Sequence, residues 1–130
     1  MTLSTVAPVR LQRSRAKGSR LVSPNGLPVV CVSRPSKWGN QYSVVRSGPD
    51  ELACYYVARW DEILKYCFTR DEATRLAVLM YENALLSRVL PYQVENVRRD
   101  LAGKNLSCWC KLGSPCHADV LLRVANGGEP

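Results

Sequence analysis

The chain has 130 residues, 46% of them hydrophobic, and a formal net charge of +7 at neutral pH. This length fits a single domain over residues 1–130 with an apolar core that needs no disulfide cross-links. No apolar run approaches the roughly 18 residues of a membrane span, and the first residues lack the pattern of a signal peptide. Composition therefore excludes a membrane protein and predicts a cytoplasmic one whose six cysteines stay reduced.

Positive charge is concentrated in the first part of the chain. Residues 1–49 contain eight arginines and lysines and no acid, and the first acidic residue is Asp50. Beyond Asp50 the charges nearly balance. Such an excess attracts phosphate, either on a nucleotide or on a nucleic acid, although it would also serve as a solubilising surface.

The predicted elements begin with two strands. We expect residues 1–7 to form a flexible N-terminal extension. Pro8 to Arg13 alternates weakly between polar and apolar side chains, which suits a strand, and a basic loop follows over residues 14–20. Val29 to Ser33 is a continuous run of mainly β-branched residues, which predicts a strand buried on both faces at the centre of a sheet.

Helical patterns dominate the middle of the chain. Ser47 and Pro49 resemble a helix start, and apolar residues recur at helical spacing from Leu52 to Cys67. Thr69 with Glu72 matches a capping box and predicts a second helix. A third, shorter amphipathic helix is expected over residues 94–101, ending near Gly103.

The end of the chain predicts one more strand and one more helix. Leu106 to Cys110 reads as a strand, and His117 to Ala125 as a helix. Strands separated by helices indicate an α/β domain with a small, mainly parallel, Rossmann-like sheet flanked by helices. The connection between the strands at 29–33 and 106–110 would contain three helices. The loops after these strands, residues 34–42 and 110–117, would then meet at one edge of the sheet, where such folds bind ligands.

Three cysteines and the only histidine form the most distinctive cluster in the sequence. Cys108, Cys110, Cys116 and His117 offer the thiolate and imidazole ligands that zinc prefers. Their spacing departs from standard zinc motifs, and a three-thiolate site would leave His117 free. On the predicted strand, Cys108 and Cys110 share one face, whereas Trp109 points to the other.

Two other interpretations of this cluster remain open. A catalytic one places Cys116 at a helix N-terminus, where the helix dipole stabilises its thiolate, with His117 available for proton transfer and Asp119 beside them. A structural one treats the cysteines as small buried residues of the core.

The loop over residues 34–42 is the candidate ligand site. Arg34 and Lys37 are candidates for phosphate binding, Trp38 for stacking on a base, and Asn40 for a base edge or sugar hydroxyl. Arg15 and Lys17 of the basic loop add two further cations. In the structural alternative, Trp38 covers the sheet edge and Asn40 bonds its own turn.

Two stretches resemble the signature of a known family. Residues 34–40 read Arg-Pro-Ser-Lys-Trp-Gly-Asn, and Asn-Leu-Ser-Cys-Trp-Cys at 105–110 precedes Pro-Cys-His-Ala-Asp-Val-Leu at 115–121. Their order and separation resemble domain of unknown function 4326, over about Val9 to Asn126. The resemblance implies an uncharacterised phage or bacterial protein and no particular reaction. Gln41 and Tyr42 stand where the family pattern usually has Pro-Phe, so the aromatic residue is kept without the proline.

The sequence leaves two classes of function open. The first is binding of a nucleotide or related phosphate-bearing ligand in a basic pocket, with or without enzymatic turnover. The second is a non-catalytic protein that contacts nucleic acid or a host protein, with structural cysteines that are free or zinc-bound. No phosphate-binding Walker loop, dinucleotide-binding motif or zinc-protease motif is present to decide between them.

Overall fold

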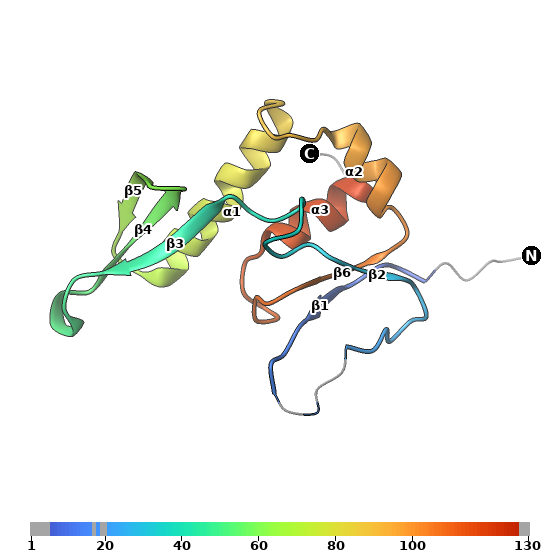
Figure 1. Cartoon of the computed structure of the whole chain (residues 1–130), viewed down its shortest axis with the longest axis horizontal. Helices are drawn as coiled ribbons and strands as arrows, with labels where there is room; N and C mark the ends of the chain where they lie inside the picture. The colour runs from blue at the N-terminus through green and yellow to red at the C-terminus, as the bar shows by residue number, and fades with distance from the viewer. Residues whose placement is uncertain (1–5, 17, 19–20, 128–130) are drawn as a thin grey trace, which may run out of the picture.

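The computed structural model of the chain describes residues 6–16, 18 and 21–127 (Figure 1). Two small sheets and three α-helices make up this part of the molecule. The strands are β1 (Arg10–Gln12), β2 (Val29–Cys31), β3 (Tyr42–Ser47), β4 (Cys54–Arg59), β5 (Glu62–Cys67) and β6 (Asn105–Cys108). The helices are a 3₁₀ turn (Asp50–Leu52), α1 (Arg70–Leu86), α2 (Val94–Leu101) and α3 (His117–Ala125).

The first sheet is parallel and has the order β1-β6-β2. This confirms the predicted parallel pairing of the strand near residue 30 with the strand near residue 106. The predicted centre of the sheet is wrong, however, because β6 lies between the other two strands and all four of its residues are buried. The three residues of β2 are only partly buried, as befits an edge strand. The β-branched run thus predicted a strand correctly, but not the position of that strand in the sheet.

The predicted helix between Leu52 and Cys67 is wrong. These residues form β4 and β5, which pair with β3 in an antiparallel sheet of order β3-β4-β5. Tyr, Val and Ile favour strands, and the hairpin between β4 and β5 closes at Trp60, whose φ is 57°. Hairpin turns with a positive φ usually carry glycine or asparagine, and a tryptophan rarely adopts this conformation. The sequence therefore does not predict the turn. Gly48, with φ 87°, makes the preceding turn where a helix start was expected.

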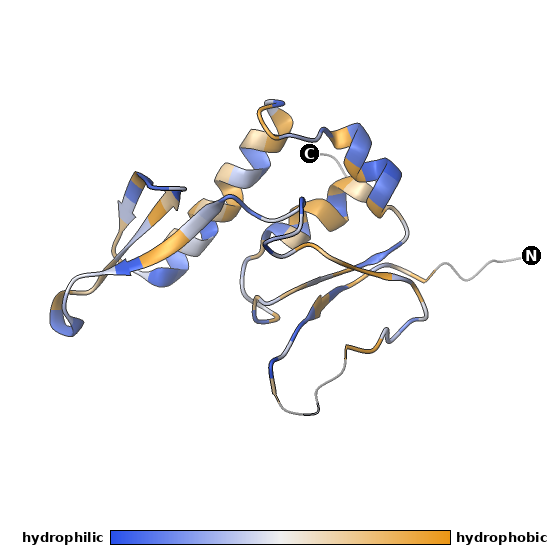
Figure 2. Cartoon of the chain, in the orientation of Figure 1, coloured by the Kyte–Doolittle hydropathy of each residue, from blue (hydrophilic) through white to orange (hydrophobic). Residues whose placement is uncertain are grey.

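The remaining helices agree with the sequence patterns. The hydroxyl of Thr69 accepts a hydrogen bond from the backbone N–H of Glu72, as the capping box predicts. Helix α2 ends just before Gly103, which adopts a φ of 74°, and α3 spans the predicted residues. Helix α1 packs across the antiparallel sheet, and α3 packs against α2, α1 and β6. Figure 2 shows α3 as mainly hydrophobic and α2 as more polar, which fits the central place of α3.

The architecture is a mixed α/β domain, and its Rossmann-like character is not confirmed. The connection from β2 to β6 contains the whole antiparallel sheet, a 3₁₀ turn and two α-helices, and the first of the three predicted helices is replaced by strands. No helix in the described part of the chain has both the length and the apolar character needed to cross a membrane. Of the predicted N-terminal extension, residues 1–5 lie outside the described residues, and the carbonyl of Ala7 accepts a hydrogen bond from Asn25.

Two tyrosine hydroxyls are hydrogen-bonded to each other inside the core, between α1 and the segment before α2. Tyr81 and Tyr92 are both buried, and the Tyr92 hydroxyl also donates to the carbonyl of Trp38 at 3.5 Å. Burial raises the pKa of both phenols above its ordinary value. The pair therefore holds its protons at pH values where an unfolded chain loses them.

This pair predicts a loss of stability at alkaline pH. The contribution of the two tyrosines to the free energy of unfolding is intact below about pH 10, the pKa of a tyrosine in the unfolded chain. Above that pH the free energy of unfolding falls by up to about 1.4 kcal/mol per pH unit for each tyrosine. Urea unfolding between pH 8 and 11 measures this slope. The Tyr81→Phe, Tyr92→Phe double variant is expected to have a shallower slope, and an unchanged slope would contradict the assignment.

Candidate functional site

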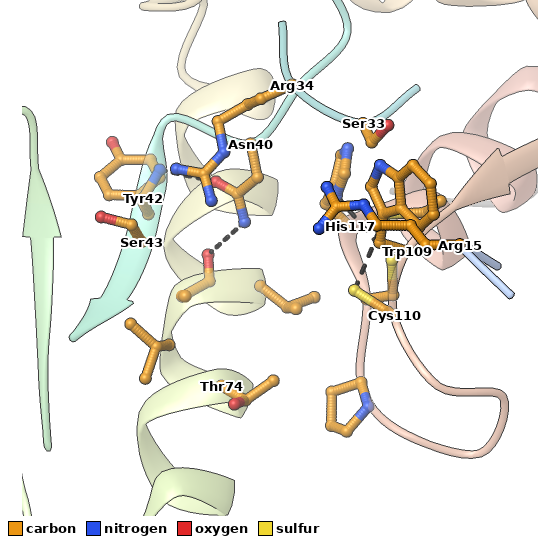
Figure 3. A pocket seen from close by; sticks show the side chains of 16 residues that line it. Arg15, Ser33, Arg34, Asn40, Tyr42, Ser43, Thr74, Trp109, Cys110 and His117 are labelled. Atoms are coloured by element: carbon orange, nitrogen blue, oxygen red, sulfur yellow. Dashed lines mark hydrogen bonds between the residues drawn. The ribbon is translucent and has the colours of Figure 1, made fainter. Parts of the chain in front are cut away.

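A pocket of about 380 Å³ lies between helix α1 and the loop that joins β6 to α3 (Figure 3). Its walls come from four segments that are far apart in the sequence. These are the loop after β1, the segment from the end of β2 into β3, the middle of α1, and the stretch from Cys108 to His117. The structure therefore brings together the two loops that were predicted to meet beyond the ends of the parallel strands.

Three cysteines meet at this pocket. The sulfur atoms of Cys108, Cys110 and Cys116 all lie within 4.8 Å of one another, and all three residues line the pocket. The Sγ atoms of Cys108 and Cys110 are 3.7 Å apart, far beyond the roughly 2.05 Å of a disulfide bond. Cys108 ends β6 and Cys116 is the N-cap of α3, so the fold of the strand-loop-helix unit positions both. Cys108 and Cys116 are buried and Cys110 is half-buried.

The three thiols share protons unequally. Hydrogen bonding with Cys110 and Cys116 lowers the pKa of Cys108 below its ordinary value. Hydrogen bonding to Cys108 raises the pKa of Cys110 and of Cys116, and burial adds to both shifts. The prediction that the helix N-terminus favours a thiolate at Cys116 stays a prediction, and the two neighbouring sulfurs act on the pKa of Cys116 in the opposite direction.

His117 is held beside the thiols rather than among them. Its Nε2 lies 2.8 Å from the carbonyl oxygen of Val32, and its ring packs edge-on against Tyr81 at 5.1 Å. A carbonyl only accepts hydrogen bonds, so Nε2 carries the proton. Burial lowers the pKa of this imidazole, which keeps it neutral and leaves a lone pair on Nδ1. That Nδ1 atom is 3.9 Å from the Sγ atom of Cys116.

Two arginines line the same pocket without carboxylate partners. None of the salt bridges among the described residues involves Arg15 or Arg34, and no acidic residue is among the described residues that line the pocket. The Arg15 guanidinium lies 4.5 Å from the ring centre of Trp109, which is 38% exposed. Figure 3 shows Arg15 and Trp109 on the cysteine side, with Arg34 and Asn40 across the pocket. The pocket therefore has a net positive lining.

Trp109 is the site residue that the sequence pattern missed. The alternation of a strand predicted that it points away from Cys108 and Cys110, but β6 ends at Cys108. Beyond that residue the chain bends, and Trp109 lines the pocket with both cysteines. The Cys-Trp-Cys spacing alone gave no sign of this bend.

Lys37 and Trp38 lie outside the pocket. Trp38 is only 4% exposed and packs edge-on against Tyr92, with ring centres 4.7 Å apart. It is a core residue and is not available to stack on a base. Lys37 forms a salt bridge with Asp100 at 3.7 Å and lies over the Trp38 ring. Two residues of the predicted ligand loop thus stabilise the fold.

Asn40 does line the pocket, but both of its side-chain groups also have local partners. Its Oδ1 accepts a hydrogen bond from the backbone N–H of Tyr42 at 2.8 Å, and its Nδ2 donates to the carbonyl of Ala77 at 3.3 Å. Asn40 thereby connects the start of β3 to α1. The predicted turn asparagine and the predicted ligand residue are compatible, because each oxygen and nitrogen can form a second hydrogen bond.

Asp119 is not brought to the pocket. Its carboxylate accepts a hydrogen bond from Arg10 at 3.2 Å, and Arg10 also donates to the carbonyls of Lys111 and Ser114. Asp119 therefore helps to hold the loop between Cys110 and Cys116, and the prediction that it lines a reactive centre with His117 is wrong. Lys17, predicted as a ligand cation, lies outside the described residues.

Comparison with known proteins places the chain in a family. One family model matches residues 11–127, which include all four segments of the pocket. The chain belongs to that family, the Domain of unknown function (DUF4326). No curated protein and no solved structure matches this member of DUF4326. The family description names no activity, so the chemistry of the pocket carries the functional argument.

Proposed function

We propose that this protein binds a nucleotide or related phosphate-bearing ligand in the pocket beside the three cysteines. The observation that carries the proposal is the pair of arginines, Arg15 and Arg34, which line one pocket that has no acidic residue among its described lining. A guanidinium forms paired, charge-assisted hydrogen bonds with phosphate oxygens. The cavity of about 380 Å³ is within the usual size range of small-molecule sites.

Neighbouring side chains supply what such a ligand needs beyond its phosphate. Ser33, Ser43 and Thr74 line the pocket with hydroxyl groups that donate or accept hydrogen bonds. Trp109 offers an exposed aromatic edge at the same wall, and its stacking against Arg15 holds that guanidinium in place. Apolar residues of α1, Ala77 and Val78, complete the opposite wall. The lining thus combines charged, hydroxyl, aromatic and apolar groups, as the phosphate, sugar and base of a nucleotide require.

We also propose that Cys108, Cys110 and Cys116 bind a zinc ion. In a tetrahedral site with zinc–sulfur bonds of about 2.3 Å, two sulfurs are about 3.8 Å apart. The Cys108 and Cys110 sulfurs are 3.7 Å apart, and the third lies within 4.8 Å of both. Zinc binds cysteines as thiolates, so its binding would displace the protons of these three neighbouring thiols.

The alternative function keeps the same cysteines in a purely structural role. Cys108 and Cys116 are 5% and 1% exposed, which suits a zinc ion that only stabilises the domain. In that case the positive pocket lining would contact nucleic acid or another protein without turnover. The two functions differ in whether a small phosphate-bearing molecule binds with one-to-one stoichiometry.

Removal of either arginine tests the proposed ligand. A charge-assisted hydrogen bond contributes about 1.5–3 kcal/mol, so Arg15→Ala and Arg34→Ala are each expected to weaken nucleotide binding by about tenfold or more. Isothermal titration calorimetry with purine and pyrimidine mono-, di- and triphosphates measures the affinity. Arg75→Ala is the matched control, because Arg75 pairs with Asp71 on the exposed face of α1. Equal losses in all three variants, or no saturable binding to the wild type, would refute the proposed ligand site.

A further inference from the structure

We infer that the zinc ion held by Cys108, Cys110 and Cys116 keeps its fourth coordination position open toward the pocket, so that a pocket ligand coordinates the metal directly. This inference rests on the zinc site proposed above and adds the chemistry of its fourth ligand. It distinguishes a metal that takes part in ligand binding from one that only cross-links the fold.

The number of protein ligands is the first argument. Zinc in proteins is almost always four-coordinate, and structural sites fill all four positions with side chains, whereas sites that act on a ligand use three. Among the described residues, the cluster at this pocket comprises three thiols and no further histidine or carboxylate. A zinc ion there has one position left for a ligand from outside the cluster.

His117 is the nearest candidate for a fourth protein ligand. Its ring is fixed by the Nε2 hydrogen bond to Val32 and by the edge contact with Tyr81. In this position its Nδ1 is 3.9 Å from Cys116, and the imidazole does not join the set of donors that lie within 4.8 Å of one another. His117 therefore packs against the cluster without belonging to it.

The direction of the open position is the second argument. All three cysteines line the pocket, so the side of the cluster that the protein does not cover faces the cavity. Arg15 and Arg34 line that same cavity. Three thiolates give a zinc site a net charge of −1, and with the two arginines the pocket keeps a net positive charge that suits a phosphate. A ligand in the pocket thus meets the metal and the arginines together.

The thiolate set also selects the type of donor. Three sulfur ligands make the metal soft, which favours nitrogen or sulfur over a carboxylate or phosphate oxygen as the fourth ligand. The fitting molecule carries phosphate for the arginines and a nitrogen or sulfur donor for zinc. Among nucleotides, purines present such a nitrogen in their five-membered ring. We therefore assign the base or a thiol group of the ligand to the metal, and its phosphate to the arginines, of which Arg15 lies on the cysteine side and Arg34 across the pocket.

Substitution of cobalt for zinc in the full chain tests the open position. Co²⁺ gives visible bands that report its coordination sphere and near-ultraviolet bands that report bound thiolate. Titration with imidazole and with 2-mercaptoethanol is expected to shift the visible bands in a saturable, one-to-one manner, while the thiolate bands persist. A purine nucleoside monophosphate is expected to compete with imidazole. The His117→Gln variant should give the same starting spectrum and the same shifts.

Two outcomes separate this inference from the proposals beneath it. Absence of thiolate bands after cobalt loading would refute the metal site itself. Thiolate bands that do not respond to imidazole or thiol, together with a changed spectrum in His117→Gln, would show a closed site with His117 as fourth ligand. X-ray absorption of the zinc-loaded wild type decides the same point without a variant, because a coordinated His117 ring would give imidazole scattering before any addition. In both cases, nucleotide binding that depends on Arg15 and Arg34 would still be observed if the proposed function is correct.

Discussion

Protein carrying Cys108→Ser is expected to lose the zinc that the wild type retains through gel filtration. Cys108 is one of the three proposed ligands, since its sulfur lies 3.7 Å from that of Cys110 and within 4.8 Å of that of Cys116. Side chains that merely orient zinc ligands are worth about 10- to 100-fold in metal affinity, so loss of one of three direct ligands is expected to cost more than about 100-fold. Metal analysis of the purified protein, with native mass spectrometry, measures the stoichiometry.

Another cysteine of the parallel sheet provides the control. Cys31 lies in β2, and its sulfur is 3.0 Å from the hydroxyl of Ser33, outside the three-thiol cluster. Cys31→Ser is expected to retain one zinc per chain. Because a metal that binds only the folded state stabilises it, a strong chelator should lower the melting temperature of the wild type and of Cys31→Ser, but not that of Cys108→Ser. Equal zinc content in both serine variants would refute the assignment of the ligands.

The patterns that predicted the fold correctly are those with a local physical cause. A threonine at an N-cap satisfies a backbone donor within its own turn, which is why the start of α1 could be read from Thr69 and Glu72. The antiparallel sheet has no comparable signal. The spacing of the apolar residues from Leu52 to Cys67 fits either one face of a helix or two paired strands. The pairing of β4 with β3 and with β5 decides between these two structures.

The site was predictable in part for a similar reason. Parallel strands direct the loops at their carboxyl ends to one edge, so the meeting of Arg34 with the cysteine unit follows from topology. The role of Trp38 did not follow, because its burial depends on Tyr92, which lies more than fifty residues away in the sequence. Asp119 likewise pairs with Arg10 across almost the whole chain. Residue type alone does not reveal such partners.

Asn105 was also missed, and its replacement by alanine is expected to destabilise the protein strongly. It is completely buried in β6, next to the start of the cysteine unit. Its Oδ1 accepts hydrogen bonds from the backbone N–H of Val9 at 3.0 Å and from Asn25 at 3.1 Å. Its Nδ2 donates to Asn25 at 2.7 Å and to Ser23 at 3.2 Å. One amide thus joins the segments that precede β1 and β2 to the central strand.

Asn105→Ala removes these bonds, leaves buried polar groups without partners and opens a cavity, so the expected loss in free energy of unfolding is about 2–4 kcal/mol. Urea denaturation measures it. Asn126→Ala is the matched control, because the Asn126 side chain also bonds backbone groups, of Gly103 and Leu122, but at an exposed helix end. Its expected loss is below about 1 kcal/mol.

A double-mutant cycle decides whether the buried amide acts as a network. Asn25 bonds Asn105 through both of its side-chain atoms, so Asn25→Ala already removes part of what Asn105→Ala removes. The double variant is therefore expected to lose less stability than the sum of the single losses, by at least about 0.5 kcal/mol. Strict additivity would mean that the two asparagines act independently. The junction of β1, β2 and β6, from which the chain leads to Arg15 and Cys108 of the pocket, would then depend on the backbone pairing alone.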